Sequence, residues 1–134
     1  MYSLVVEDEP VSQAILQGIL EPFGPCDLAS SGVEGVAMLQ KALSQDKRYD
    51  LVCLDIQMPD MDGLETLKIF RKIEQEKGIQ RFGQVKVFMV TSLYNRQSLE
   101  TAFYQGDCDE YIEKPIDPND LMERLQKYKL IGRT

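Results

Sequence analysis

Three carboxylates in this sequence each follow a short apolar run and could together bind a metal ion. Glu7 and Asp8 come directly after the run Ser3–Val6, and Asp55 ends the run that begins at Leu51. Carboxylates that lie close together raise one another's pKa unless a cation sits between them. Because the chain has no histidine, such an oxygen-rich site suits a hard, partly hydrated ion, and we expect Mg²⁺. The alternative is three separately solvated loop carboxylates.

A hydroxyl and an ammonium group follow two further apolar runs. Thr91 comes after the run 85–90, and Lys114 comes shortly after a run that ends at Ile112. Beside a metal ion these groups suit phosphoryl chemistry, in which Asp55 attacks phosphorus while Lys114 and Thr91 contact phosphoryl oxygens. Taken singly, the lysine could be an ordinary surface residue and the threonine a residue that favours a strand.

Strand and helix patterns alternate along the whole chain. The strands are predicted at 3–6, 26–29, 51–55, 85–90 and around 111–112, with apolar residues at helical spacing between them. This alternation is typical of a parallel sheet covered by helices on both faces. The apolar positions that predict the five helices are Val11, Ala14, Ile15, Gly18 and Ile19; Val33, Val36, Ala37 and Leu43; Leu64, Leu67, Phe70 and Ile73; Leu99, Ala102 and Phe103; and Leu121 and Leu125.

Capping residues and turns support these elements. The predicted helix starts are Pro10, Ser31 with Glu34, Asp62, Asn95, and Asp117 with Pro118, and Gly106 is expected to end the fourth helix. In the turn 58–63, Pro59 fixes one φ angle and Gly63 can take a positive φ. The connections 44–49 and 74–84 are long and polar, and we expect both to be solvated.

The positions of the polar residues in this pattern indicate one site. In an open parallel sheet, ligands bind outside the carboxyl ends of the strands. The acid pair, the third acid, the hydroxyl and the lysine are all predicted at that edge, so we expect them to lie together.

The bulk composition restricts the class of protein. The chain has 134 residues, of which 43% are hydrophobic, which suits one domain spanning 1–134 with a core at about 2–130. No apolar stretch approaches the roughly 20 residues that cross a bilayer, and no basic segment precedes the first strand, so we expect no signal peptide. A net charge of −7 disfavours direct nucleic-acid binding. Three widely spaced cysteines suggest neither disulfides nor a zinc site, and we expect a cytoplasmic protein.

Over residues 2 to about 130, the sequence resembles the receiver domain of a two-component response regulator, including single-domain chemotaxis regulators. The resemblance rests on the acid pair Glu7 and Asp8, the pattern Asp-x-x-Met-Pro-x-Met-Asp-Gly over 55–63, Thr91 with Ser92, and Lys114 with Pro115. It implies an α/β fold of the doubly wound, flavodoxin-like type. That fold has a five-stranded parallel sheet in the order 2-1-3-4-5 and five helices.

The resemblance also implies a metal site and a phosphoacceptor. Asp55 would be the phosphoacceptor. Asp8 and Asp55 would ligate Mg²⁺ directly, Glu7 would act mainly through water, and the backbone carbonyl of Gln57 would be a further ligand. Glu7 stands where the family more often has aspartate, a change that could alter the metal geometry. Gln57 and Leu93 occupy positions where the family tunes its dephosphorylation rate.

A switch is implied by further matches. Lys114 and Thr91 would contact the phosphoryl group, and Tyr111 would be the switch aromatic, which turns inward as Thr91 moves toward the phosphate. On sequence alone, Tyr111 could equally be a packed residue. The bond between Lys114 and Pro115 is expected to be cis.

The predicted function is therefore a phosphorylation-activated switch. A sensor histidine kinase or a histidine phosphotransfer protein would donate the phosphoryl group to Asp55. A target protein would bind the face made by the fourth helix, fifth strand and fifth helix, and self-dephosphorylation would reset the switch. No multiple-turnover activity, nucleic acid or membrane is expected.

Three rival functions remain open. A Mg²⁺-dependent phosphatase that uses an aspartyl-phosphate would want an acid at Gln57. An interaction module that ignores phosphate would not need the full set of polar groups. A flavin-binding domain would need a phosphate-binding loop after the first strand. The chain could be a stand-alone regulator or the receiver of a longer protein.

Overall fold

A computed structural model describes residues 1–92 and 108–132 of the protein, and its centre is a five-stranded sheet. All neighbouring strands pair in parallel, in the order β2-β1-β3-β4-β5. This result confirms the predicted sheet and its strand order. The strands are β1 (Ser3–Val6), β2 (Cys26–Ala29), β3 (Leu51–Asp55), β4 (Lys86–Thr91) and β5 (Glu110–Glu113).

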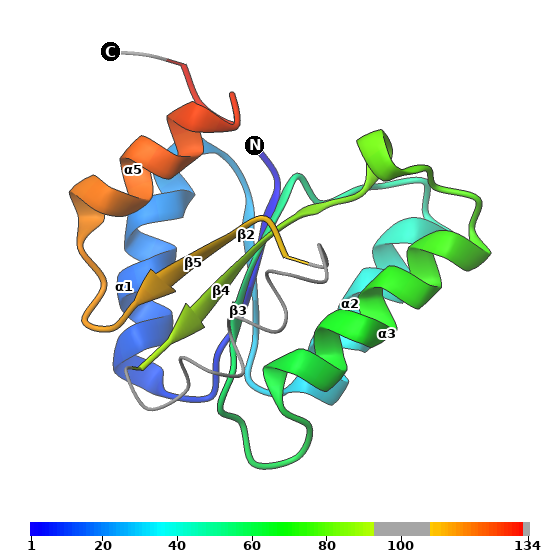
Figure 1. The fold of residues 1–134 in the computed structure, drawn as a ribbon, viewed down its shortest axis with the longest axis horizontal. Helices are drawn as coiled ribbons and strands as arrows, with labels where there is room; N and C mark the ends of the chain where they lie inside the picture. The colour runs from blue at the N-terminus through cyan, green and yellow to red at the C-terminus, as the bar shows by residue number, and fades with distance from the viewer. Residues whose placement is uncertain (93–107, 133–134) are drawn as a thin grey trace.

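Helices cover both faces of the sheet (Figure 1). Helices α1 and α5 lie on one face, and α2 and α3 lie on the other. The helix predicted from Asn95 to Gly106 lies outside the described residues. None of the helices in the described ranges combines the length and the apolarity that a membrane crossing would require. The helices are α1 (Pro10–Leu20), α2 (Gly32–Ser44), α3 (Gly63–Glu76) and α5 (Pro118–Lys127), with short 3-10 turns at Glu21–Phe23 and Arg81–Gly83.

The predicted caps explain where three of these helices begin. Ser31 Oγ accepts a hydrogen bond from the backbone N–H of Glu34 at the start of α2. Asp62 caps α3 and Asp117 caps α5, each through its side-chain oxygen. A side-chain acceptor at this position satisfies a backbone N–H group that has no partner inside the helix. Local sequence therefore fixes these helix starts.

The sheet separates the core into two apolar clusters. Leu4, Val52 and Phe70 belong to the cluster under α2 and α3. Val5 and Phe88 belong to the cluster under α1 and α5. Because β1 and β3 are buried on both faces, they are apolar almost throughout, as expected for inner strands of a parallel sheet.

The apolar stripe that predicts α1 is not the face that packs on the sheet. Val11 is 64% exposed and Ile15 is 41% exposed, whereas Leu16 and Leu20 are buried. Ala14 and Gly18 also face solvent, and only Ile19 of the predicted set packs against the core. The helix carries two apolar stripes, and spacing alone does not say which stripe meets the sheet.

Helix α2 shows a similar difference for a steric reason. Val33 is 57% exposed, and Ala37 is also exposed, although both belong to the predicted apolar face. The buried positions include Gly32 and Gly35. A Cβ at Gly35 would lie 2.9 Å from a side-chain methyl of Val6. The helix therefore approaches β1 too closely for a larger residue at that position.

The two long connections are exposed over most of their length, as expected, but buried residues anchor their ends. Tyr49 is 5% exposed, and its hydroxyl donates to Asp27. Glu74, which lies in the last turns of α3, is 2% exposed. Its Oε2 accepts the backbone N–H of Val85 at 2.7 Å, and its Oε1 accepts from Arg71 at 2.8 Å. The Glu74 carboxylate therefore links α3 to the backbone just before β4.

Replacing Glu74 should test this anchor. In the Glu74→Ala variant, the Val85 N–H and the Arg71 guanidinium lose a buried partner, so the free energy of unfolding should fall by about 3 kcal/mol. The matched control is Glu76→Ala, at an exposed site two residues further along the chain. This substitution should change the free energy of unfolding by less than about 0.5 kcal/mol. Urea unfolding followed by circular dichroism measures both, and equal effects would contradict the role of Glu74.

Candidate functional site

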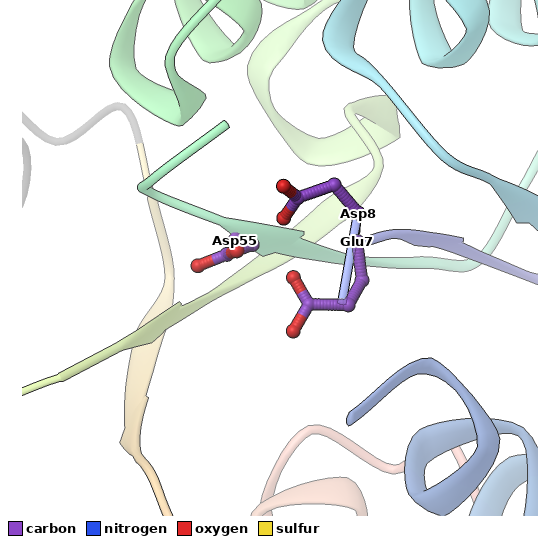
Figure 2. Close-up of side chains that lie close together, drawn as sticks. All are labelled: Glu7, Asp8 and Asp55. Atoms are coloured by element: carbon purple, nitrogen blue, oxygen red, sulfur yellow. The ribbon is translucent and has the colours of Figure 1, made fainter. Parts of the chain in front are cut away.

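Four charged side chains meet at the carboxyl edge of the sheet. Glu7 and Asp8 follow β1, Asp55 ends β3, and Lys114 follows β5. Strand β1 pairs with β3, with Val6 opposite Leu54, so the acids that follow are neighbours. Figure 2 shows the carboxylates of Glu7, Asp8 and Asp55 pointing to the same side, and one oxygen from each lies within 4.8 Å of the others. The sequence correctly predicts that these residues lie together.

Lys114 supplies the cation of this group. Its Nζ lies 2.6 Å from Glu7 Oε1 and 3.6 Å from Asp55 Oδ2. Although burial acts to lower it, the pKa of Lys114 is raised above its ordinary value by Glu7 and Asp55. The lysine therefore stays charged and bridges the two buried carboxylates.

Asp55 is held in an unfavourable environment for an isolated charge. It is 5% exposed. Burial, followed by the adjacent Glu7 carboxylate, raises the pKa of Asp55 to about 8, while Lys114 and the backbone N–H of Gln57 act in the opposite direction. A single lysine does not offset this cost, so the carboxylate would gain from a second cation.

The oxygen donors at this edge fit a hard divalent cation. Glu7 is 1% exposed, and its Oε2 has no hydrogen-bond partner among the described residues. Asp8 is exposed and could keep hydrating waters around an ion. Buried polar atoms are normally satisfied, so an unpaired carboxylate oxygen beside two other carboxylates favours a bound ion or water. Mg²⁺ takes such carboxylate and water ligands.

A cleft of about 600 Å³ opens beside these residues. It is wide enough for a phosphoryl group together with part of its carrier, and its lining mixes acidic, basic and apolar side chains. The lining residues are Asp8, Glu9, Asp55, Ile56, Gln57, Met58, Pro59, Asp62, Leu64, Ser92 and Lys114.

The turn after β3 is fixed by a close backbone approach. A Cβ at Gly63 would overlap the backbone carbonyl of Asp55. Within the described residues, positive φ angles at glycine occur at Gly24 and Gly78, so Gly63 does not use the positive φ that glycine allows. Glycine is needed there because α3 begins directly against the end of β3.

Thr91 and Tyr111 each make a contact outside the four charged side chains. Thr91 ends β4 and is 2% exposed, and its hydroxyl donates to the backbone carbonyl of Ser92 at 2.9 Å. Tyr111 lies on β5 and is 36% exposed, with the guanidinium of Arg124 over its ring at 5.8 Å. The bond between Lys114 and Pro115 is cis, as the resemblance implies.

Sequence reasoning missed the contacts of two acidic residues, one in the cleft and one in the turn beside it. Glu9 lines the cleft and caps α1 by accepting from the backbone N–H groups of Val11 and Ser12. The side chain of Ser12, followed by these backbone groups, holds the pKa of Glu9 below its usual range. A following proline was a signal for this cap. Asp60 accepts from the N–H of Val33 at 3.2 Å and so ties the turn to α2. Nothing in local spacing indicates that contact.

Comparison with known proteins gives a consistent result. The sequence matches the family model for the response regulator receiver domain over residues 3–126. It is 32% identical over 127 residues to hybrid signal transduction histidine kinase L of Dictyostelium discoideum, covering 93% of this chain. The match spans only 7% of the length of that relative.

Solved structures agree with the fold. One is the receiver domain of Ssk1 from Saccharomyces cerevisiae, in a co-crystal with the histidine phosphotransfer signaling protein Ypd1. It has a TM-score of 0.77 and 26% identity, and the match covers 96% of this chain and 88% of that one. Another is a CheX-CheY-BeF3-Mg+2 complex from Borrelia burgdorferi, with a TM-score of 0.79, 24% identity, and 98% and 90% coverage.

The electrostatics of the cleft predict how one substitution affects stability. In metal-free buffer near neutral pH, Asp55→Asn should increase the free energy of unfolding by about 1 kcal/mol, because it removes a carboxyl group that burial and Glu7 force to take up a proton on folding. Added Mg²⁺ should stabilise the natural chain more than this variant. Urea unfolding with a chelator or with Mg²⁺ measures both effects. A loss of stability in Asp55→Asn without metal would contradict this electrostatic account.

Proposed function

Because the chain belongs to the response regulator receiver domain family, we propose that it is a phosphorylation-operated switch of a two-component system. The observation that carries this proposal is the buried Asp55 carboxylate, which faces an open cleft with Glu7, Asp8 and Lys114 around it. We propose that residues 1–134 act as a single receiver domain with its core at about 2–130, and that it works in the cytoplasm.

Asp55 is the proposed phosphoacceptor. One of its oxygens attacks the phosphorus of a phosphohistidine, the P–N bond breaks, and the imidazole leaves with a proton. Lys114, already 3.6 Å from Asp55, offsets charge that builds on the phosphoryl oxygens. Mg²⁺, held by Asp8, Asp55 and the backbone carbonyl of Gln57 with Glu7 acting through water, would neutralise further negative charge when bound. Attack of water on the acyl phosphate returns Asp55 to its free form.

The conformational response would involve Thr91 and Tyr111. The Thr91 hydroxyl, which donates to the Ser92 carbonyl, would turn toward a new phosphoryl oxygen. Tyr111 would leave its contact with Arg124 and turn inward. That movement changes the face of β5 and α5 that a target protein would recognise, together with the fourth helix expected at 95–106. The phosphoryl group would bias two existing arrangements of the domain.

The exposed stripe on α1 is the proposed contact for the phosphoryl donor. Helix α1 starts at the rim of the cleft, where Glu9 is both its cap and a lining residue. Val11, Ala14, Ile15 and Gly18 face solvent along the helix. A donor helix that carries phosphohistidine could pack on this stripe and present its phosphoryl group to Asp55. The Ypd1 co-crystal with a similar receiver domain supports a donor of this class.

Labelling by a small phosphodonor tests the acceptor. Acetyl phosphate with Mg²⁺ should add one acid-labile phosphoryl group to the natural chain and none to Asp55→Asn, as measured by intact mass. The control Asp46→Asn, an exposed aspartate at the opposite edge of the sheet, should label normally. Full labelling of Asp55→Asn would exclude Asp55 as the acceptor. Continuous hydrolysis of small phosphomonoesters would instead favour a phosphatase.

A charge on the α1 stripe tests donor recognition. Ile15→Asp should slow transfer from a phosphohistidine donor about tenfold, because it puts a carboxylate into an apolar contact. Labelling by acetyl phosphate should not change, because α1 would not contact that small donor. Ala37→Asp, a comparable change at an exposed apolar residue of α2 on the other face of the sheet, serves as the control. Equal slowing by both variants would argue against the α1 contact.

A further inference from the structure

The two long connections meet at the edge of the sheet opposite Asp55. One connection, 45–50, joins α2 to β3, and the other, 77–85, joins α3 to β4 (Figure 1). A Cβ at Gly83 would lie 3.2 Å from Nη1 of Arg48 and 3.3 Å from Ile79. Residues from both connections line a concavity of about 290 Å³, which we call the basic hollow: Leu43, Asp46, Lys47, Arg48, Lys77 and Ile79.

The basic hollow carries an excess of positive charge. Lys47, Arg48 and Lys77 are exposed, and within the described residues none of them forms an ion pair. The single acid in the lining is Asp46. The carbonyl ends of α2 and α3 favour nearby cations, which accounts for part of this clustering. In a chain of net charge −7, three unpaired cations around one hollow still make a local positive region.

An exposed aromatic ring stands beside the hollow. Phe82 is 99% exposed, the highest value among the large apolar side chains of the described residues, and its neighbour Gly83 lies against Arg48. The base of its turn is fixed, because the backbone N–H of Ile79 donates to the carbonyl of Glu74 at 2.9 Å. The Glu74 carboxylate also holds Val85. An aromatic ring on a preorganised turn costs little further entropy when a partner covers it.

We propose that the basic hollow and Phe82 form a docking surface for an acidic segment of a partner protein. Carboxylates of the segment pair with Lys47, Arg48 and Lys77, and an apolar side chain of the segment covers the Phe82 ring. A phosphodiester polymer or an anionic membrane would need an extended basic face. This surface has only three cations in its lining, and an acid lies among them, so it does not suit either ligand. It lies at the amino edge of the sheet, so it is separate from the phosphoacceptor cleft.

A defined peptide probe tests the surface. The probe is a short synthetic peptide that alternates glutamate with leucine, titrated into the ¹⁵N-labelled chain, and a lysine–leucine peptide is the charge-reversed control. Saturable shifts are expected at the backbone amides of Lys47, Arg48, Lys77 and Phe82. Arg48→Glu combined with Lys77→Glu should weaken binding of the acidic peptide about tenfold or more, and Phe82→Ser should also weaken it. The matched control Lys68→Glu, at an exposed lysine in the first half of α3, should bind normally.

Three results would overturn the proposal. The first is that millimolar acidic peptide shifts no backbone amide of the basic hollow. The second is that the shifts persist when Arg48→Glu and Lys77→Glu are combined. The third is that a single-stranded oligonucleotide or phosphatidylglycerol vesicles bind the hollow more strongly than the acidic peptide does. The spectra of the variants away from the hollow show whether they remain folded. Labelling of Asp55 by acetyl phosphate should be unchanged in every variant, so failure of this proposal is distinguishable from failure of the proposed phosphorylation.

Discussion

The ammonium group of Lys114 lies between Glu7 and Asp55 at the edge of a buried sheet, and the rest of the site depends on this one cation. Two nearly buried carboxylates at such short range repel each other strongly. The free energy needed to desolvate both carboxylates exceeds the stabilisation that a single lysine provides. The edge therefore holds an unbalanced negative charge that favours a further cation, and the proposed phosphoryl transfer to Asp55 would require such added positive charge.

The sheet brings these charged residues together although they are far apart in the sequence. Glu7, Asp55 and Lys114 come from three strands that are far apart along the chain. They meet because parallel strands end at one edge of the sheet, with Val6 of β1 opposite Leu54 of β3. The turn after Asp55 is held at its far side by the contact of Asp60 with α2 and by the tight fit of Gly63. A rigidly held Asp55 beside an open cleft suits the proposed phosphoryl transfer, which depends on alignment.

The sequence predicts those features that rest on strand order and local caps. The alternation of elements places Glu7, Asp8, Asp55 and Lys114 correctly, since each follows a strand. It does not predict which apolar stripe of α1 is buried, because both stripes have helical spacing and the choice depends on packing with the sheet. The spacing of residues in the sequence also does not predict which contacts a given side chain makes. The Thr91 hydroxyl donates a hydrogen bond to the Ser92 carbonyl, and the Arg124 guanidinium lies over the Tyr111 ring. Local sequence predicts neither contact. The close approach at Gly63 likewise depends on how α3 meets β3.

Both ends of the described fold lie away from the cleft. Met1 precedes β1 at its amino end, and α5 runs back from the carboxyl edge, so that Met1 and Ile131 pack against the same core cluster. A polypeptide joined at either terminus would leave on the side remote from Asp55. The same unit could thus be joined to proteins of very different length, such as the much larger kinase that it resembles, without any linker obstructing access to Asp55.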